Sequence, residues 1–304
     1  MEHVETHAAH VFLAGDRAFK IKKAVKLPYL DFSAKDSRRS VLADELRINR
    51  VFAPDIYLGL DEVRGEPVLV MRRFPSHSLL SWKMAHGEMD PELARKLAAM
   101  AAAAHAQAPR RDMPGIEIMA GLGAQLSKAF VDSPDIFHPA ETLEFHALYE
   151  AALKSNKALL NLRNEMGLVR RCHGDMHSGN IIVEEGEPKL FDAIEFSEKI
   201  ATIDVLYDLA FLLMDLWTHE ERAAANTLLN GYLHLRRAEE DLSGLAALPL
   251  FLATRAGVRA LVTADLAHEL ALKNSMKERG QALDWFRASL GYLKAPPPRL
   301  LCIG

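Results

Sequence analysis

The chain has 304 residues, of which 49% are hydrophobic and 26% charged, and its formal net charge is −4. This length suggests two domains or lobes, and this composition favours a large packed core and argues against disorder. The slightly acidic balance gives no reason to expect a nucleic-acid partner, because such proteins usually carry a basic surface.

The cysteines and the apolar segments indicate a soluble cytoplasmic protein without a membrane span. The two cysteines, Cys172 and Cys302, are too few for a disulfide framework or a four-ligand zinc site. Residues 1–5 lack the basic and apolar regions of a signal peptide. No apolar run reaches the roughly 18 residues that a spanning helix needs, since charged side chains such as Asp215 and Arg255 interrupt the longest runs.

The first third of the chain is predicted to be a β-rich region with one helix. An amphipathic pattern predicts the helix over residues 33–52, ending before Pro54. Residues 14–16 form a turn. Short apolar or alternating segments predict four strands, at residues 11–13, 18–22, 56–60 and 68–71.

Beyond Pro75 the pattern becomes helical. Residues 218–221 (T-H-E-E) resemble a capping box that opens a new helix. A β hairpin with strands at residues 181–183 and 189–191 interrupts the helical pattern. The predicted helices cover residues 93–108, 139–166 and 205–217, and further helices fill the chain to about residue 293.

The last ten residues differ from the rest. Residues 295–299 contain three consecutive prolines, which is typical of a stiff linker. Residues 300–304 then form a short apolar segment that reaches Gly304, and a strand ending in glycine is how a P-loop domain begins. One hypothesis is that the chain is half of a longer two-enzyme architecture, and the alternative is a frayed apolar tail.

Residues 172–180 carry the most informative motif, which reads C-H-G-D-M-H-S-G-N and is followed by Asp192. Phosphoryl transfer from a magnesium nucleotide needs a carboxylate at the attacking hydroxyl and oxygen ligands on the metal. Asp175 is the candidate base. Asn180 and Asp192 are the candidate Mg²⁺ ligands, because the predicted hairpin brings the end of its second strand back towards Asn180.

Two histidines flank this base. His173 and His177 are interpreted as structural residues that hydrogen-bond the loop backbone. A metallohydrolase centred on His173, Asp175 and His177 is a weaker alternative, because the pattern H-x-H-x-D-H is absent and transition-metal sites need more histidines nearby.

The motif at residues 173–180, with Phe191 and Asp192, resembles the catalytic loop of the aminoglycoside phosphotransferase family, small-molecule kinases related to protein kinases. Residues 203–210 are similar to the family's D-x-x-x-D-L-A helix start, in which the second aspartate, here Asp208, supports the catalytic loop. The resemblance covers nearly the whole chain. Residues 6–7, 11–16, 19–23 and 53–59 are similar to an uncharacterised bacterial branch of the family, in which a P-loop domain often follows.

This resemblance implies an α+β, protein-kinase-like fold with a small β-rich lobe and a larger, mainly helical lobe. The expected division is a nucleotide-binding N-lobe and hinge over residues 1–74, then a helical C-lobe with the catalytic loop over residues 75–294. Residues 295–304 would be the proline-rich linker and the first strand of a missing P-loop domain. ATP and Mg²⁺ are the implied cofactors.

The family's phosphate-binding lysine is expected on the second strand. Ala18-Phe19-Lys20 matches the kinase A-x-K spacing, because period two puts Ala18 and Lys20 on one face. Lys22 shares that face and is the alternative. Glu45, in the middle of the predicted helix, is the expected partner of the lysine, with Asp44 as the alternative.

Residues 68–74 resemble the hinge between the lobes. Met71 would line the adenine pocket, and backbone groups of Arg72 and Phe74 would bind the adenine edge. Alternatively, Arg72 and Arg73 are ordinary exposed charges. Residues 1–13 contain no glycine, so residues 6–10 would have to cover the phosphates without a glycine-rich loop. This departure leaves the choice between ATP and GTP open.

The leading functional prediction is an ATP-dependent transfer of the γ-phosphoryl group to a hydroxyl of a small molecule. The alternative is a nucleotide-binding regulatory module that controls an attached or partner domain. Expected partners are the acceptor and possibly a P-loop domain or protein, but no nucleic acid or membrane. A cationic acceptor could be received by acidic side chains on the helical lobe, which are otherwise solvated: Glu117, Asp132, Asp135, Glu195 and Glu198.

Overall fold

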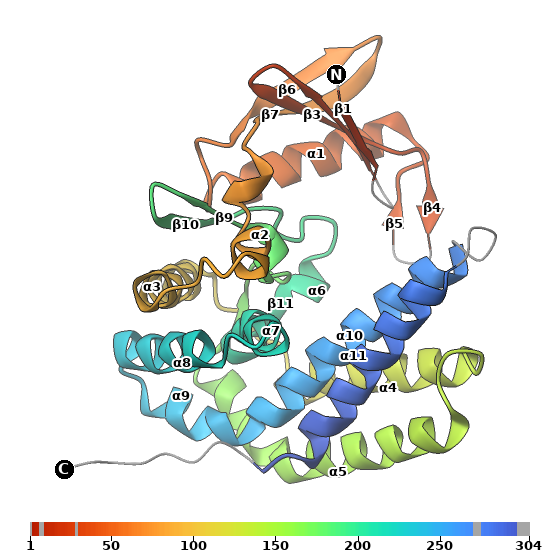
Figure 1. Cartoon of the computed structure of the whole chain (residues 1–304), viewed down its shortest axis with the longest axis vertical. Helices are drawn as coiled ribbons and strands as arrows, with labels where there is room; N and C mark the ends of the chain where they lie inside the picture. The colour runs from red at the N-terminus through yellow and green to blue at the C-terminus, as the bar shows by residue number, and fades with distance from the viewer. Residues whose placement is uncertain (1, 6–8, 28–29, 270–274, 297–304) are drawn as a thin grey trace.

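The structure is a computed structural model that describes residues 2–5, 9–27, 30–269 and 275–296. Figure 1 shows a small lobe with a twisted sheet at the top and a larger helical lobe below it. The predicted α+β architecture with a β-rich first lobe is therefore confirmed. The described linker residues, Ala295 and Pro296, follow the last helix, and the expected final strand lies outside the described residues.

The first lobe is built on a five-stranded antiparallel sheet with the order β1-β2-β3-β7-β6. Glycines with positive φ, Gly15 and Gly65, form the turns of its two tight hairpins. A separate pair of two-residue strands, β4 (Lys26–Leu27) and β5 (Leu30–Asp31), follows the third strand. The sheet strands are β1 (Glu2–Glu5), β2 (Ala9–Ala14), β3 (Arg17–Lys22), β6 (Tyr57–Val63) and β7 (Glu66–Arg72).

Helix α1 (Lys35–Asn49) packs against β6 and β7. It turns Leu42 and Glu45 towards the protein interior, and both are fully buried. Leu42 joins Tyr57 and Leu69 in a small apolar core that also includes Ile182 of the helical lobe. The two lobes therefore share a core where they meet, which limits how far they can separate.

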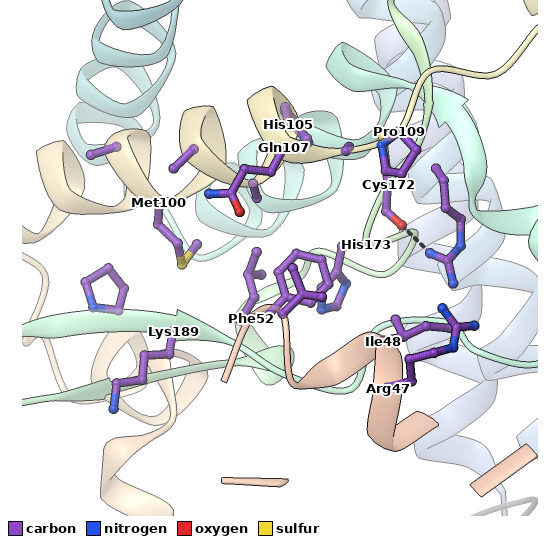
Figure 2. A pocket seen from close by; sticks show the side chains of 18 of the residues that line it. Arg47, Ile48, Phe52, Met100, His105, Gln107, Pro109, Cys172, His173 and Lys189 are labelled. Atoms are coloured by element: carbon purple, nitrogen blue, oxygen red, sulfur yellow. Dashed lines mark hydrogen bonds between the residues drawn. The ribbon is translucent and has the colours of Figure 1, made fainter. Parts of the chain in front are cut away.

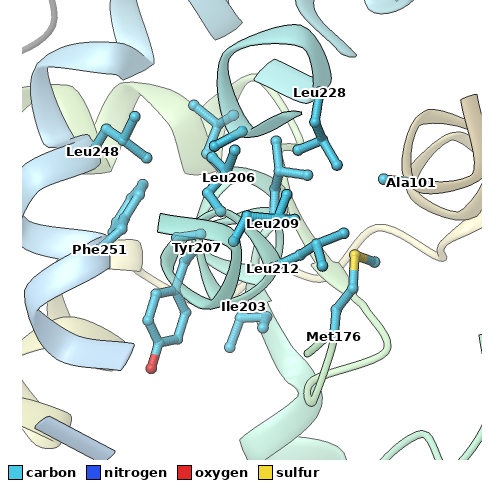
Figure 3. Close-up of a cluster of buried hydrophobic side chains, with 14 of the residues drawn as sticks. Ala101, Met176, Ile203, Leu206, Tyr207, Leu209, Leu212, Leu228, Leu248 and Phe251 are labelled. Carbon is cyan, nitrogen blue, oxygen red and sulfur yellow. The ribbon is translucent and has the colours of Figure 1, made fainter. Parts of the chain in front are cut away.

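The helical lobe is organised around α7 (Val205–Thr218), whose residues are almost all buried. Figure 3 shows Leu206, Leu209 and Leu212 of this helix surrounded by side chains from α3, α8 and α10. The helices of this lobe are α2 (Leu80–Ala85), α3 (Pro91–Gln107), α4 (Gly115–Asp132), α5 (Pro139–Glu165), α6 (Glu198–Ala201), α7, α8 (Arg222–Arg236), α9 (Glu239–Gly244), α10 (Leu248–Glu269) and α11 (Met276–Lys294).

Between α5 and α7 the chain forms two small antiparallel pairs that hold the motif segment. β8 (Val169–Arg171) pairs with β11 (Thr202–Asp204), and the hairpin β9 (Ile181–Glu184) and β10 (Glu187–Leu190) follows the motif. The hairpin matches the sequence prediction. The β8–β11 pair was not predicted, because each strand is only three residues long.

The predicted capping box at residues 218–221 is wrong. Thr218 is the last residue of α7, where its hydroxyl donates to the Met214 carbonyl, and α8 begins only at Arg222. The side chain of Glu221, the residue before α8, makes no capping hydrogen bond. Helices α2 and α4 were also missed as separate elements.

One helical run, residues 239–268, is long and apolar enough to cross a membrane by length and composition. In this fold, 61% of its most apolar window is buried inside the protein. Most of it is α10, which packs against α11 and α7 as a core helix.

Candidate active site

The motif residues Asp175 and Asn180 are in direct contact. The Asn180 amide nitrogen donates to the Asp175 carboxylate at 2.8 Å and to the Asp175 carbonyl at 3.0 Å. A short 3-10 turn, Ser178–Asn180, produces this approach by folding the chain back just before β9. The amide N–H groups are therefore used within the loop, which leaves the amide oxygen as the group that can ligate a metal.

Lys20 of β3 lies between two carboxylates. Its Nζ is 2.6 Å from Glu45 and 2.8 Å from Asp192. Glu45 is completely buried, whereas 43% of the Asp192 side chain is exposed. The predicted lysine, the predicted helix glutamate and the predicted aspartate therefore meet at one point between the lobes.

The charges at this point stabilise one another. Burial works to lower the pKa of Lys20, but Asp192 and Glu45 outweigh it and raise that pKa well above its usual value. Burial works in the opposite direction on Asp192, where the neighbouring Lys20 ammonium holds the pKa of the carboxyl below its usual value. Both side chains are therefore charged at neutral pH.

Lys22, the alternative lysine, occupies the other side of Glu45. Its Nζ is 2.8 Å from Glu45 and 2.7 Å from Glu195, and both Lys22 and Glu195 are almost fully buried. Together Asp192, Lys20, Glu45, Lys22 and Glu195 form a row of alternating charges, referred to below as the charged row. Within this row only Lys20 contacts Asp192, so Lys20 is the lysine next to the candidate metal ligand.

Asp192 has an unusual backbone conformation, with φ at 58°. This left-handed region is costly for a residue other than glycine, so it persists only where neighbours fix it. The Asp192 N–H donates to the Tyr57 hydroxyl at 2.9 Å, and the Ala193 N–H donates to the Asn49 amide oxygen at 2.8 Å. Residues of the first lobe therefore fix the candidate metal ligand, and sequence reasoning missed both of them.

His173 is a structural residue, as predicted. Its Nε2 is 3.0 Å from the Phe191 carbonyl, and its Nδ1 accepts from the Asp175 N–H at 3.3 Å. Burial lowers the pKa of His173, which keeps the ring neutral and able to act as a donor at one nitrogen and an acceptor at the other. The ring thereby connects the backbone of the candidate base to the residue that precedes Asp192.

His177 lies beside the candidate base. Its Nδ1 accepts from the Gly179 N–H at 3.0 Å, and its Nε2 is 3.5 Å from the Asp175 carboxylate. Burial works to raise the pKa of Asp175, but His177 outweighs it and lowers that pKa to about 2. The candidate base is therefore ionised at neutral pH before any ligand arrives.

Two aspartates of α7 support the catalytic loop from below. Asp208 accepts from the Gly174 N–H at 3.1 Å, and Asp215 accepts from the Ser178 N–H at 2.9 Å. The two are seven residues apart, which is about two helical turns and puts them on one face. The resemblance implied the role of Asp208. The role of Asp215 was not predicted. The one sequence feature that could have indicated it is the position of this charged residue within the apolar run of residues 209–216.

The buried surroundings of Asp208 are completed by two further side chains. Arg255 of α10 is 3.4 Å from Asp208 and donates to the Gly174 carbonyl at 3.1 Å. His105 is 3.3 Å from Asp208 and 2.8 Å from the Tyr232 hydroxyl. Asp208, Asp215, Arg255 and His105 are called the α7 platform below. His105, Cys172 and Asp208 are also close enough to hold a metal ion, but the bonds to Gly174 and Tyr232 already occupy this group.

The hinge residues take varied positions. The Arg72 side chain pairs with Glu184 at 2.6 Å and with Asp55 at 2.9 Å, so it ties the hinge to the β9–β10 hairpin. The Arg72 N–H donates to the Ile56 carbonyl within the sheet, so the predicted adenine contact through that N–H is not supported. Phe74 packs edge-on against Phe191 at 5.2 Å.

Met71 lies at the edge of the small apolar core of the first lobe, opposite Ala18 in the β3–β7 pair. The two residues are therefore neighbours in the sheet, and the role of Met71 at an adenine pocket stays a prediction. Of the expected phosphate-covering loop, residues 6–8 lie outside the described residues, and Ala9 and His10 begin β2.

A cavity of about 620 Å³ lies behind the catalytic loop, between α1, α3 and β10. Figure 2 shows Ile48, Phe52, Met100 and His173 at its centre. Its lining does not include Lys20, Asp175, Asn180 or Asp192. The cavity is therefore lined in part by His173 but by no residue of the charged row.

The acidic residues expected to receive a cationic acceptor do not form such a site. Four of the five have cationic partners: Asp132 with Lys128, Asp135 with Arg279, Glu195 with Lys22, and Glu198 with Arg111. Glu117, the fifth, lies on α4 beside a hollow lined by Lys154 and Lys157. The alternative prediction of solvated side chains fits the exposed Asp132, Asp135 and Glu198, but it is wrong for Glu195, which is buried in the charged row.

Solved structures share this fold at low sequence identity. A choline/ethanolamine kinase family protein from Mesorhizobium loti is 16% identical, with a TM-score of 0.55 and coverage of 96% of this chain and 92% of that one. Choline kinase from Cryptosporidium parvum gives a TM-score of 0.60 at 11% identity, covering 96% and 88%. The GDP complex of an aminoglycoside 2'-phosphotransferase-IIIa gives 0.55 at 15% identity, covering 95% and 91%. The kinase-like two-lobe fold is thus confirmed.

Curated relatives include an uncharacterised protein from Mycobacterium tuberculosis and one from Mycobacterium bovis, each 28% identical over 271 residues. The match covers 85% of this chain but 53% of each relative, so the chain spans about half the length of these proteins. The sequence profile of the family described as "Phosphotransferase enzyme family" matches residues 30–248. This match covers most of the chain and includes the whole catalytic loop, and the protein therefore belongs to the phosphotransferase enzyme family.

Proposed function

We propose that this chain transfers the γ-phosphoryl group of a magnesium-bound nucleotide to a hydroxyl of a small molecule, with Asp175 as the base. The observation that carries the proposal is the meeting of Lys20, Glu45 and Asp192 between the lobes, together with the Asp175–Asn180 contact. These are the groups that phosphoryl transfer requires: a cation for the phosphates, oxygen ligands for the metal, and a carboxylate for the acceptor.

The donor set suits Mg²⁺, which prefers carboxylate and carbonyl oxygens. Asn180 and Asp192 would hold it, and the ion would neutralise the charge that develops on the phosphates. When Asp192 is engaged in this way, it no longer needs Lys20 as its partner. Lys20 would then be available to the phosphates, with Glu45 holding its ammonium in place.

Asp175 acts on the acceptor. Its carboxylate accepts a hydrogen bond from the attacking hydroxyl and takes the proton as the new P–O bond forms. The bond between the γ-phosphorus and the bridging oxygen breaks, and the nucleoside diphosphate leaves. A pKa of about 2 makes Asp175 a weak base in the ligand-free protein. This suits a reaction in which the proton leaves the hydroxyl late, when the oxygen is already bonded to phosphorus. Asn180 fixes the carboxylate and so aims it at the acceptor.

The nucleotide is proposed to be ATP. GTP is the direct competitor, because among the solved relatives an aminoglycoside 2'-phosphotransferase-IIIa is complexed with GDP. A cytoplasmic location and a P-loop domain as partner remain predictions from the sequence.

A regulatory nucleotide-binding module remains the second candidate, and the observation that favours it is the length of the curated relatives, about half of which this chain spans. A module that only senses nucleotide does not need Asp175. The presence of an ionised Asp175, oriented by Asn180, supports the enzyme instead.

The test is a screen for consumption of ATP and of GTP in the presence of Mg²⁺ and a panel of sugars, amino alcohols, hydroxy acids and aminoglycosides. We expect acceptor-dependent consumption that yields a phosphorylated product. Asp175→Asn should reduce it about 100- to 10,000-fold, the usual loss when a general base is removed. Full product formation by that variant would contradict the role of Asp175, and acceptor-independent hydrolysis that is unchanged in the variant would favour the regulatory module.

A further inference from the structure

Helix α10 carries two arginines one turn apart, Arg255 and Arg259. Residues four apart lie on the same face of a helix, with Cβ atoms about 5–6 Å from each other. The Arg255 guanidinium has protein partners: it contacts Asp208 and donates to the carbonyls of Gly174 and Tyr207. Contacts within the α7 platform thus explain why Arg255 is present, but they do not explain why Arg259 is.

Arg259 lacks the partners that Arg255 has. Its guanidinium lies 5.4 Å from the Trp285 ring centroid, but no carboxylate in the described part of the chain lies within ion-pair distance of it. Its Nε is shielded from solvent and has no hydrogen-bond acceptor among the described residues. Arg259 as a whole is half-buried, but a shielded donor without an acceptor is costly, and native proteins rarely leave one unsatisfied. This arginine is therefore suited to a ligand that supplies the missing acceptor.

The position of Arg259 relates it to the candidate base. Arg255, one turn earlier, donates to the carbonyl of Gly174, the residue before Asp175. The Phe211 ring contacts both Arg255, at 4.7 Å, and His177, at 5.2 Å. Trp285, the ring beside Arg259, packs against the cluster that contains Phe211. A continuous set of side-chain contacts therefore connects Asp175, through His177, Phe211 and Trp285, to Arg259.

We propose that Arg259 binds an anionic group, a carboxylate or a phosphate, on the acceptor whose hydroxyl is placed at Asp175. The planar guanidinium binds such groups through two parallel hydrogen bonds, and stacking on Trp285 fixes its plane. The acceptor class is then a hydroxy acid or a phosphorylated alcohol. This inference rests on the proposed function, and it specifies the substrate class that the function leaves open.

The test is calorimetric binding of matched probes to the full chain, in the presence of Mg²⁺ and a non-hydrolysable ATP analogue. The probe pairs are glycerate with glyceramide, and glucose 6-phosphate with glucose; choline and kanamycin are the cationic probes. We expect at least one anionic probe to bind about tenfold or more tightly than its neutral partner, the usual contribution of a charged hydrogen bond. Arg259→Gln should abolish this preference and leave nucleotide affinity unchanged, and Arg259→Lys should retain part of it.

Arg287→Gln is the matched control, because it removes a cation from an exposed position on α11 that pairs only weakly with Glu141, at 3.6 Å. It should behave as the wild-type protein. No preference for anionic probes in the wild type, or an equal preference in Arg259→Gln, would overturn the proposal. A preference for anions without any phosphotransfer would count against the proposed function and would leave the Arg259 site intact.

Discussion

The charged row and the α7 platform are both built from buried or half-buried charges, but they differ in how those charges are used. In the platform, Asp208 and Asp215 bond to backbone N–H groups of the catalytic loop, and Arg255 bonds to backbone carbonyls. In the charged row, side chains bond mainly to one another, and at one end Asp192 is 43% exposed. The platform therefore fixes the loop, whereas the row can exchange partners at its exposed end.

This difference indicates where stability and where activity should respond to substitution. A charge that holds the backbone cannot be replaced by a ligand, so its loss should appear first in the free energy of unfolding. A charge that is held by another exchangeable charge can turn to a nucleotide, so its loss should appear first in turnover. Each prediction below challenges one side of this comparison.

The largest expected effect on stability belongs to the platform. Asp208→Asn leaves the Arg255 guanidinium buried without its counter-charge, and removing one partner of a buried ion pair typically costs about 3–5 kcal/mol. Since asparagine can still accept from the Gly174 N–H, we expect a loss near the lower end of that range, measured by denaturant unfolding. Asp215→Asn is the matched control, which removes a charge that bonds Ser178 without an ion pair in the described structure, and should cost about 1–2 kcal/mol. Equal losses would contradict the importance of the Arg255–Asp208 pair.

The next effect separates the two lysines of the row. Lys20→Met should reduce turnover about 100- to 1,000-fold, because in the proposed function Lys20 stabilises the charge on the phosphates in the transition state. The loss of turnover in Lys22→Met should be at least ten times smaller than the loss in Lys20→Met, since Lys22 contacts only Glu45 and Glu195 in the charged row. Steady-state kinetics with the nucleotide varied will distinguish them. A larger loss in Lys22→Met would assign the phosphate contact to Lys22.

The smallest effect is a pH dependence centred on His173. Its folded-state pKa is lowered, so below its unfolded value, about 6.5, the unfolded chain binds a proton that the folded chain excludes. This stabilisation is therefore present at pH 7.5 and is lost as the pH falls through the unfolded value, with a slope of at most about 1.4 kcal/mol per pH unit for one proton. His173→Asn should flatten the slope of unfolding free energy between pH 7.5 and pH 5.5. Parallel slopes for the two proteins would show that His173 is not the titrating group.

Sequence alone predicted the charged row better than it predicted the platform. Lys20 and Glu45 follow from local patterns, because the alternation of a strand and the centre of an amphipathic helix fix which way each side chain points. Asp192 follows from the hairpin that returns the chain to Asn180. These inferences need only short-range geometry, together with a resemblance whose motif is compact.

The remaining contacts depend on the packing of distant segments. Nothing near Tyr57 or Asn49 in the sequence indicates that they hold the backbone of residues 192 and 193, which lie more than 130 positions away. Asp215 interrupts an apolar helix, and only the fold shows that it bonds Ser178. The error at Thr218 has a different cause. The local sequence resembles a capping box, but α7 continues one residue beyond its predicted end at residue 217 and includes Thr218.

The most direct test of the central claim is the Mg²⁺ dependence of nucleotide binding. Calorimetry with a non-hydrolysable ATP analogue should show that Mg²⁺ tightens binding to the wild-type protein by tenfold or more, and that Asp192→Ala abolishes the dependence on Mg²⁺. Because Mg²⁺ is proposed to bind Asp192 and Asn180, it should tighten nucleotide binding to the wild-type protein but not to the variant. Equal, Mg²⁺-independent binding by both proteins would contradict it.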